Sequence, residues 1–112
     1  MSALAAAALL LAADVFGVSL TPRIGFAPQD AQIRVRTNDP AFYCPEVEVE
    51  WGDDSLTTQQ GDCEPEEKPD EFRWSRWHRY RVCSDEPLTA KVTLSQGGKR
   101  RVGKATILLR CQ

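Results

Sequence analysis

The sequence predicts an all-β protein, built as an antiparallel sandwich of one domain. Apolar and polar residues alternate with period two in several segments, which is the pattern of strands with one buried face. Clusters of Gly, Pro, Asn and Asp separate these segments, and none of them has the pattern of a convincing helix. A length of 112 residues is enough for one hydrophobic core and too short for two.

The first clear strand is at residues 32–36, QIRVR, where Ile33 and Val35 alternate with Arg34 and Arg36. The Asn-Asp-Pro sequence at residues 38–40 ends it. A further strand is expected upstream, around residues 18–26.

The segment EVEVEW at residues 46–51 predicts the next half-buried strand. Its alternation divides the side chains into two sets: Val47, Val49 and Trp51 face the core, and Glu46, Glu48 and Glu50 face solvent. Three like charges on one strand cost little when a neighbouring strand supplies Lys or Arg. The sequence GDDS at residues 52–55 then predicts a tight turn.

Residues 59–70 contain mostly Gly, Asp, Glu and Pro and are predicted to form a loop. An aromatic-rich strand follows at residues 72–80, FRWSRWHRY. Period two again gives two faces: Phe72, Trp74, Arg76, His78 and Tyr80 on one side, and Arg73, Ser75, Trp77 and Arg79 on the other.

The last two strands are predicted to form a hairpin around the turn Gln96-Gly97-Gly98. Both strands have an inward set: Leu88, Ala90, Val92 and Leu94 before the turn, and Ala105, Ile107, Leu109 and Cys111 after it. Five or six strands, with a seventh at residues 18–26, predict an immunoglobulin-like layout.

Residues 1–13, MSALAAAALLLAA, form an apolar run of the length of a secretory signal peptide and too short to span a bilayer. Cleavage is expected after Ala13, which leaves a single domain at residues 14–112, or after Ser19. No Lys or Arg precedes the run, and a buried N-terminal helix is the alternative. A lipid anchor is disfavoured because no Cys follows the run.

Four cysteines in a short exported chain indicate disulfides. Residues equidistant from the centre of a hairpin turn face each other across the ladder. Cys44 and Cys63 are symmetric about position 53.5, in the GDDS turn, and Cys83 and Cys111 are symmetric about Gly97. We therefore predict the bonds Cys44–Cys63 and Cys83–Cys111. A zinc site is disfavoured because the sequence lacks a C-x-x-C spacing.

The charges divide into two blocks. Residues 44–71 hold eleven acidic residues and one Lys, whereas residues 72–110 hold ten Lys and Arg and two acidic residues. Either the two blocks neighbour each other in the sheets and largely cancel, or they form a two-signed surface that orients a charged partner. The net charge of −2 lacks the basic excess that is typical of nucleic-acid binding.

Two short motifs, VEWGDDS and HRY, resemble the PKD domain, an immunoglobulin-like sandwich of extracellular proteins whose central strand ends in W-x-F-G-D-G. Trp51 stands at the second aromatic of that motif, Gly52 and Asp53 match directly, and His78 and Tyr80 match the family's H-x-Y. Asp54 replaces the last glycine. The resemblance covers about residues 32–109 and implies that His78 and Tyr80 are structural.

The sequence predicts no catalytic residue and no cofactor. Asp53, Asp54 and Asp62 are weak candidates for a calcium site, but they lack the D-x-D-x-D-G loop, and aspartates at turns usually bond the backbone. His78 is the only histidine, and neither Ser75 nor Ser84 has the context of a nucleophile. The glutamates of EVEVEW lie on one exposed strand face, which does not favour a glycosidase pair.

A binding surface is predicted at Arg73, Trp77 and Arg79, because exposed tryptophan beside arginine suits protein recognition or stacking on sugar rings. The alternative is that one of Trp74 and Trp77 lies in the core and that the acidic loop covers the other. The sequence thus predicts a secreted or periplasmic, non-catalytic module that binds an extracellular or envelope protein or carbohydrate. It could instead be an inhibitor of proteases acting through residues 59–70, or a purely structural envelope protein.

Overall fold

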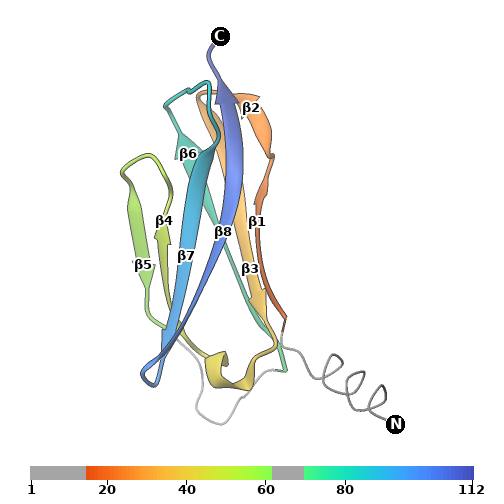
Figure 1. Cartoon of the computed structure of the whole chain (residues 1–112), viewed down its shortest axis with the longest axis vertical. Coiled ribbons are helices and arrows are strands. Elements are labelled where there is room, and N and C mark those ends of the chain that lie inside the picture. Colours follow the sequence, from red (N-terminus) through yellow and green to blue (C-terminus); the bar gives the residue numbers. More distant parts are fainter. Residues whose placement is uncertain (1–14, 62–69) are drawn as a thin grey trace, which may run out of the picture.

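The computed structural model describes residues 15–61 and 70–112, which form eight strands in two packed sheets (Figure 1). The three-stranded sheet has the order β1-β3-β6, and the five-stranded sheet has the order β2-β8-β7-β4-β5. The bounds are β1 (Phe16–Thr21), β2 (Ile24–Phe26), β3 (Gln29–Thr37), β4 (Glu46–Glu50), β5 (Leu56–Gln59), β6 (Phe72–Tyr80), β7 (Leu88–Gln96) and β8 (Lys99–Arg110). The prediction of an all-β protein is confirmed. No helix in these two ranges is long and apolar enough to cross a membrane.

In the three-stranded sheet, β3 lies between β1 and β6 and is antiparallel to both. Ile33 and Val35 are buried as predicted, and the strand continues beyond residues 32–36 in both directions. β3 pairs with β6 over nine residues, from Gln29 opposite Tyr80 to Thr37 opposite Phe72. This long register determines which side chains of β6 share a face with the arginines of β3.

The expected strand at residues 18–26 is two strands in different sheets, which corrects the sequence-based prediction. β1 ends at Thr21, and β2 starts at Ile24 and pairs in parallel with β8. Pro22 lies between them, and its nitrogen has no hydrogen to donate to a ladder. The chain therefore leaves one sheet there and joins the other, where Arg23 accepts a hydrogen bond from the backbone N–H of Leu108 at 2.8 Å.

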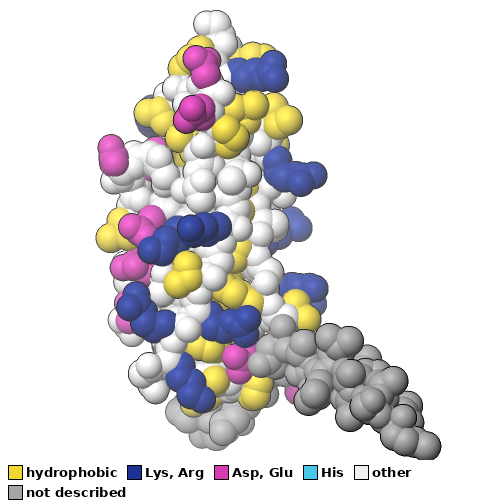
Figure 2. Space-filling model, viewed as in Figure 1, with side chains coloured by type: hydrophobic (Ala, Val, Ile, Leu, Met, Phe, Trp, Pro, Cys, Tyr) yellow, Lys and Arg dark blue, Asp and Glu magenta, His cyan; other side chains and the backbone are white. Residues whose placement is uncertain are grey.

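In the five-stranded sheet, β4 lies between β7 and β5. Val47, Val49 and Trp51 are buried, as the alternation predicts. On the other face, the Glu50 carboxylate lies 3.5 Å from the ammonium of Lys91 on β7. Figure 2 shows Lys and Arg side chains over β7 and β8 beside acidic side chains toward β4 and β5. The acidic strand and its basic neighbours thus meet in this sheet.

The core lies between the sheets and includes residues from both. Trp51 and Tyr80 are its largest fully buried side chains. The hydroxyl of Tyr80, at the end of β6, donates a hydrogen bond of 2.9 Å to the backbone carbonyl of Trp51, just after β4. A buried hydroxyl needs such a partner, and this one joins the two sheets.

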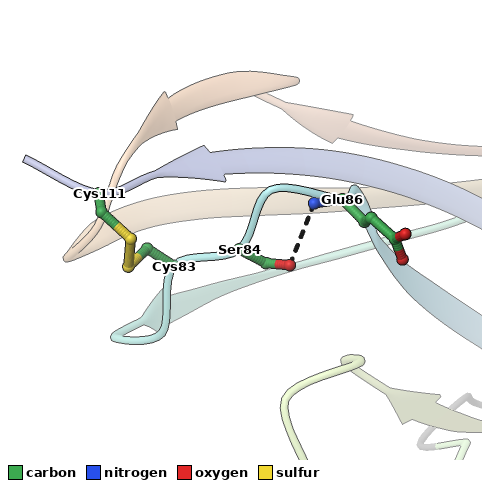
Figure 3. Close-up of a disulfide and its surroundings, with 4 residues drawn as sticks. All are labelled: Cys83, Ser84, Glu86 and Cys111. Atoms are coloured by element: carbon green, nitrogen blue, oxygen red, sulfur yellow. Dashed lines mark hydrogen bonds between the residues drawn. A yellow bond between two sulfur atoms is a disulfide. The ribbon is translucent and has the colours of Figure 1, made fainter.

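The bond between Cys83 and Cys111 is present, with the two Cα atoms 5.2 Å apart (Figure 3). The pairing is confirmed, but its geometric reason needs correction. Leu88 faces Ile107 and Gln96 faces Lys99, so the centre of the hairpin lies between Gly97 and Gly98. Cys83 precedes the ladder and is positioned through Ser84, whose N–H donates to the carbonyl of Leu109 at 2.9 Å.

Several sequence-based predictions fall on residues outside the described ranges. They are the signal peptide at residues 1–13, the metal candidate Asp62 and the Cys44–Cys63 bond, because of Cys63. The loop predicted at residues 59–70 needs one correction, since Gln59 is the last residue of β5 and pairs with Val47. Ser19, the second expected cleavage position, lies inside β1 opposite Arg34, so cleavage there would remove most of that strand.

Removing the Cys83–Cys111 bond should destabilise the fold. A disulfide between residues 28 apart is expected to contribute about 3 to 4 kcal/mol by restricting the unfolded chain. We expect the double variant Cys83→Ala/Cys111→Ala to lose this amount in urea unfolding of oxidised samples. An unchanged unfolding midpoint would show that the bond adds nothing to stability.

The turn after β4 requires glycine at position 52, since Gly52 has a φ of +93° and an added Cβ would lie 2.6 Å from the backbone oxygen of Thr89. Gly98 also has a positive φ, of +79°, but open space around it. We expect Gly98→Ala to cost about 1 to 2 kcal/mol from backbone strain alone. Gly52→Ala should cost at least ~1 kcal/mol more from the clash, as measured by chemical unfolding. Equal costs would contradict the close approach to Thr89.

Candidate functional site

The residues of the motifs VEWGDDS and HRY meet at the junction between the two sheets. The Asp53 carboxylate accepts a hydrogen bond from the backbone N–H of Ser55 at 3.1 Å, and its other oxygen lies 2.8 Å from Nε2 of His78. The His78 ring stacks on Trp51 with centroids 4.4 Å apart and meets Tyr80 edge-on. Since an ionised carboxylate can only accept, Nε2 carries the hydrogen in this bond.

These contacts place the His78 and Tyr80 side chains at the junction between the two sheets. Burial by itself raises the pKa of Asp53, but the hydrogen bonds from His78 and Ser55 outweigh it and lower the pKa below 3.8. Burial also raises the pKa of the Tyr80 hydroxyl, with a smaller contribution from the charge of Asp53. Asp53 is thereby held as a carboxylate that accepts hydrogen bonds, and Tyr80 as a protonated hydroxyl that donates one.

Neither nucleophile candidate has a hydrogen bond with His78. Ser75 lies on β6 at an odd position and faces the other side of the strand from His78. The hydroxyl of Ser84 accepts a hydrogen bond from the N–H of Glu86 at 3.1 Å. The part of the chain that the structure describes thus pairs His78 with a turn aspartate and no hydroxyl nucleophile.

Three of the acidic candidates, Asp53, Glu46 and Glu50, are engaged in structural contacts. Both oxygens of Asp53 are bonded, as above. Glu46 accepts from Gln60 at 3.1 Å, and Glu50 is paired with Lys91. Among residues 15–61 and 70–112, no group of three His, Cys, Asp or Glu side chains is arranged to hold a metal ion.

The two central tryptophans of β6 lie on opposite faces. Trp74 is half-buried, and its Nε1 donates to Oε1 of Gln59 on β5 at 3.2 Å. Trp77 lies on the outer face of the three-stranded sheet, and 62% of it is exposed. The sequence left open whether Trp77 is exposed or covered, and in the structure it is exposed.

The other two predicted binding residues flank Trp77 on the same face. Arg79 donates two hydrogen bonds to the carboxylate of Asp30, at 2.8 and 3.1 Å, and these bonds hold the pKa of Asp30 below its usual value. Arg73 lies at the other end of the strand, 3.2 Å from Glu71. Both arginines therefore have a carboxylate counter-ion. Arg79 is the next outward residue after Trp77 on β6, whereas Ser75 separates Trp77 from Arg73.

Two further arginines share this face, which the sequence does not reveal. The register places Arg36 between Gly17 and Arg73, and it places Arg34 between Ser19 and Ser75. Together these six residues line a shallow groove of about 680 Å³, which we call the arginine groove. Period-two alternation in the sequence does predict that Arg34 and Arg36 face outward. It does not predict that β3 pairs with β6, because that pairing joins residues about forty positions apart in the chain.

Comparisons with known proteins identify no family for this chain. No family model matches the sequence, and neither does any curated protein. Among solved structures, the chain is similar to the alkylpurine DNA glycosylase AlkC of Pseudomonas fluorescens bound to DNA containing an abasic site analog, with 12% identity and a TM-score of 0.47. The match covers 87% of this chain and 30% of the glycosylase chain. A likeness of this degree assigns neither a fold family nor an activity.

The bond between Asp53 and His78 should make stability depend on pH in the acid range. Because the pKa of Asp53 is lower in the folded state, its carboxylate contributes stability above about pH 3.8, and this contribution is lost as the pH falls through the folded-state pKa. We expect Asp53→Asn to cost about 1 to 3 kcal/mol at pH 7 in urea unfolding, and the difference from the unsubstituted protein to shrink below pH 4.

The neighbouring variant Asp54→Asn is the matched control for this experiment. It removes the same charge one residue away, at a position with a φ of +68° that asparagine adopts readily. It should change the free energy of unfolding by no more than ~0.5 kcal/mol. Equal effects of the two substitutions at all pH values would refute a specific role for the Asp53 carboxylate.

Proposed function

We propose that this protein is a non-catalytic binding module with an immunoglobulin-like, PKD-like fold, which contacts a carbohydrate or protein partner outside the cytoplasm. The observation that carries the proposal is Trp77, a large aromatic side chain left 62% exposed on the outer face of β6, the edge strand of the three-stranded sheet. Tryptophan and arginine are the residues most enriched where binding energy concentrates, and a flat indole also suits the face of a sugar ring.

The strand order supports the fold part of the proposal. The immunoglobulin layout places its first, second and fifth strands in one sheet and its third, sixth and seventh in the other. With β1 and β2 taken as one split first strand, β3 as the second, β4 as the third and β6 to β8 as the last three, these strands are distributed as in that scheme. β5 differs from the fourth strand of the scheme, because it pairs with β4 in the five-stranded sheet. In the PKD pattern the two motifs have a structural role. The contacts that Trp51, Asp53, His78 and Tyr80 make with one another fit such a role.

The proposed location is supported by the disulfide. Bonds such as Cys83–Cys111 persist in the periplasm and outside the cell and are rare in the cytosol. The apolar run at residues 1–13 is of the kind that directs export. We therefore place the module in the periplasm or outside the cell.

The sheet face suits binding better than chemistry. The side chains around Trp77 are the paired Asp30 and Arg79, with Gln32 opposite Trp77 across the strand pair. A paired carboxylate and guanidinium are held in their charged forms and do not exchange protons near neutral pH. Such a surface positions a partner without acting on it.

The proposal predicts that binding depends on Trp77. Removing a central tryptophan from a contact typically costs 2 kcal/mol or more, so Trp77→Ala should weaken binding at least ~tenfold on an array of defined glycans or in capture from an extracellular protein fraction. Phe26→Ala is the matched control, because Phe26 is 52% exposed on β2 of the other sheet. Identical binding by the Trp77→Ala variant and the unsubstituted protein would remove the proposed surface.

A further inference from the structure

The arginine groove concentrates positive charge on a protein whose net charge is −2. Of the three arginines in the groove, Arg36 and Arg73 share one carboxylate, that of Glu71, which lies 3.2 Å from Arg73 and 3.9 Å from Arg36. The side chain of Arg34 bonds Oε1 of Gln32 and has no ion pair with any carboxylate in the described ranges. The groove thus has more guanidinium than carboxylate and can accept anionic groups.

The outer face of the three-stranded sheet is a regular grid. Across the strands, one row is Gly17, Arg36 and Arg73, the next is Ser19, Arg34 and Ser75, and the third is Thr21, Gln32 and Trp77. Successive rows are ~6.7 Å apart, since outward residues recur every second position of a strand. An extended ligand lying along the strands would therefore meet an aromatic ring first and then two successive rows of arginine.

The residues around the arginines are small or polar. Gly17, Ser19 and Ser75 leave the groove open above the backbone, so that a ligand can reach the guanidinium groups from the side. The hydroxyls of the two serines and the amide of Gln32 are hydrogen-bonding groups at the same face. Hydroxyl-rich rings that carry carboxylates would find partners for both kinds of group here.

We propose that the outer face of the three-stranded sheet binds an acidic polysaccharide, with a sugar ring stacked on Trp77 and uronate carboxylates held by Arg34, Arg36 and Arg73. This inference rests on the proposed function and specifies its ligand class. Arginine suits the role because its planar guanidinium can donate two parallel hydrogen bonds to one carboxylate.

Other partners fit this face less well. A protein interface of ordinary strength has a buried apolar centre, whereas Trp77 is surrounded here by Gln32, Arg79 and Asp30. Nucleic acid, whether duplex or single-stranded, carries a dense series of phosphates and is usually met by a broadly basic surface. On this face, the carboxylates of Asp30 and Glu71 lie beside Arg79 and Arg73, near the two ends of β6, and would repel phosphates there.

The test is isothermal titration of the oxidised protein with three probes at 50 mM salt: hexagalacturonate, the neutral xylohexaose and a single-stranded DNA dodecamer. We expect hexagalacturonate to bind at least ~tenfold more tightly than xylohexaose. Its affinity should fall several-fold when the salt is raised to 200 mM, because screening weakens exposed charge pairs. Equal affinity for the two sugars, or comparable affinity for the DNA, would overturn the proposal.

Variants locate the site. Arg34→Gln should weaken hexagalacturonate at least ~fivefold and leave any xylohexaose binding within ~twofold, because Arg34 is the groove arginine with no ion pair to a described carboxylate. Arg100→Gln is the matched control, since Arg100 is exposed on β8 of the other sheet and its loss changes the net charge equally. Equal weakening by the two variants would show a general charge effect and refute the groove.

The outcomes also separate this inference from the function on which it rests. If neutral glycans or a protein partner bind through Trp77 and Arg34→Gln has no effect, the acidic class is wrong and the binding module remains. If Trp77→Ala leaves all binding intact, the proposed surface itself is wrong. Thermal melting of each variant, compared with the unsubstituted protein, shows whether a loss of binding reflects unfolding.

Discussion

The hydrogen bond from the Tyr80 hydroxyl to the carbonyl of Trp51 fixes how the two sheets face each other. Both side chains are fully buried, so the hydroxyl could not lose this partner without the cost of an unsatisfied polar group in the core. His78 extends the same junction, stacked on Trp51 and bonded to Asp53 in the turn after β4. The end of one strand in each sheet is thereby attached to the other sheet.

This junction also determines what the three-stranded sheet presents to solvent. With Tyr80 and His78 turned inward, the odd-numbered residues of β6 face outward, including Trp77. The antiparallel pairing with β3 then aligns Arg34 and Arg36 with Ser75 and Arg73. The exposed tryptophan and the arginine groove therefore both depend on the register of β6 against β3. A shift of β6 by one residue would turn Trp77 toward the core and move Arg73 and Ser75 away from the groove.

Charged side chains have different neighbours in the two sheets. In the five-stranded sheet the acidic strand β4 lies beside β7, and Glu50 meets Lys91, so that opposite charges neighbour each other as one interpretation of the sequence expects. In the three-stranded sheet Arg36 lies opposite Arg73, and positive charges neighbour each other. Like charges across a strand pair are unfavourable unless a counter-ion or a ligand is near, and Glu71 supplies only part of the compensation. Opposite charges are thus paired on the five-stranded sheet, whereas the outer face of the three-stranded sheet has an excess of positive charge.

The sequence by itself determined most of the strands, their buried faces and one disulfide, because period-two alternation and turn residues are local properties of the chain. It did not identify β5. It placed Val47, Val49 and Trp51 inside, and it placed Arg73, Trp77 and Arg79 on one outward face. It did not separate β1 from β2, and it did not join Arg34 and Arg36 to the face of Trp77. Tertiary structure decided both, because the change of sheet at Pro22 and the pairing of β3 with β6 depend on contacts between segments far apart in the chain.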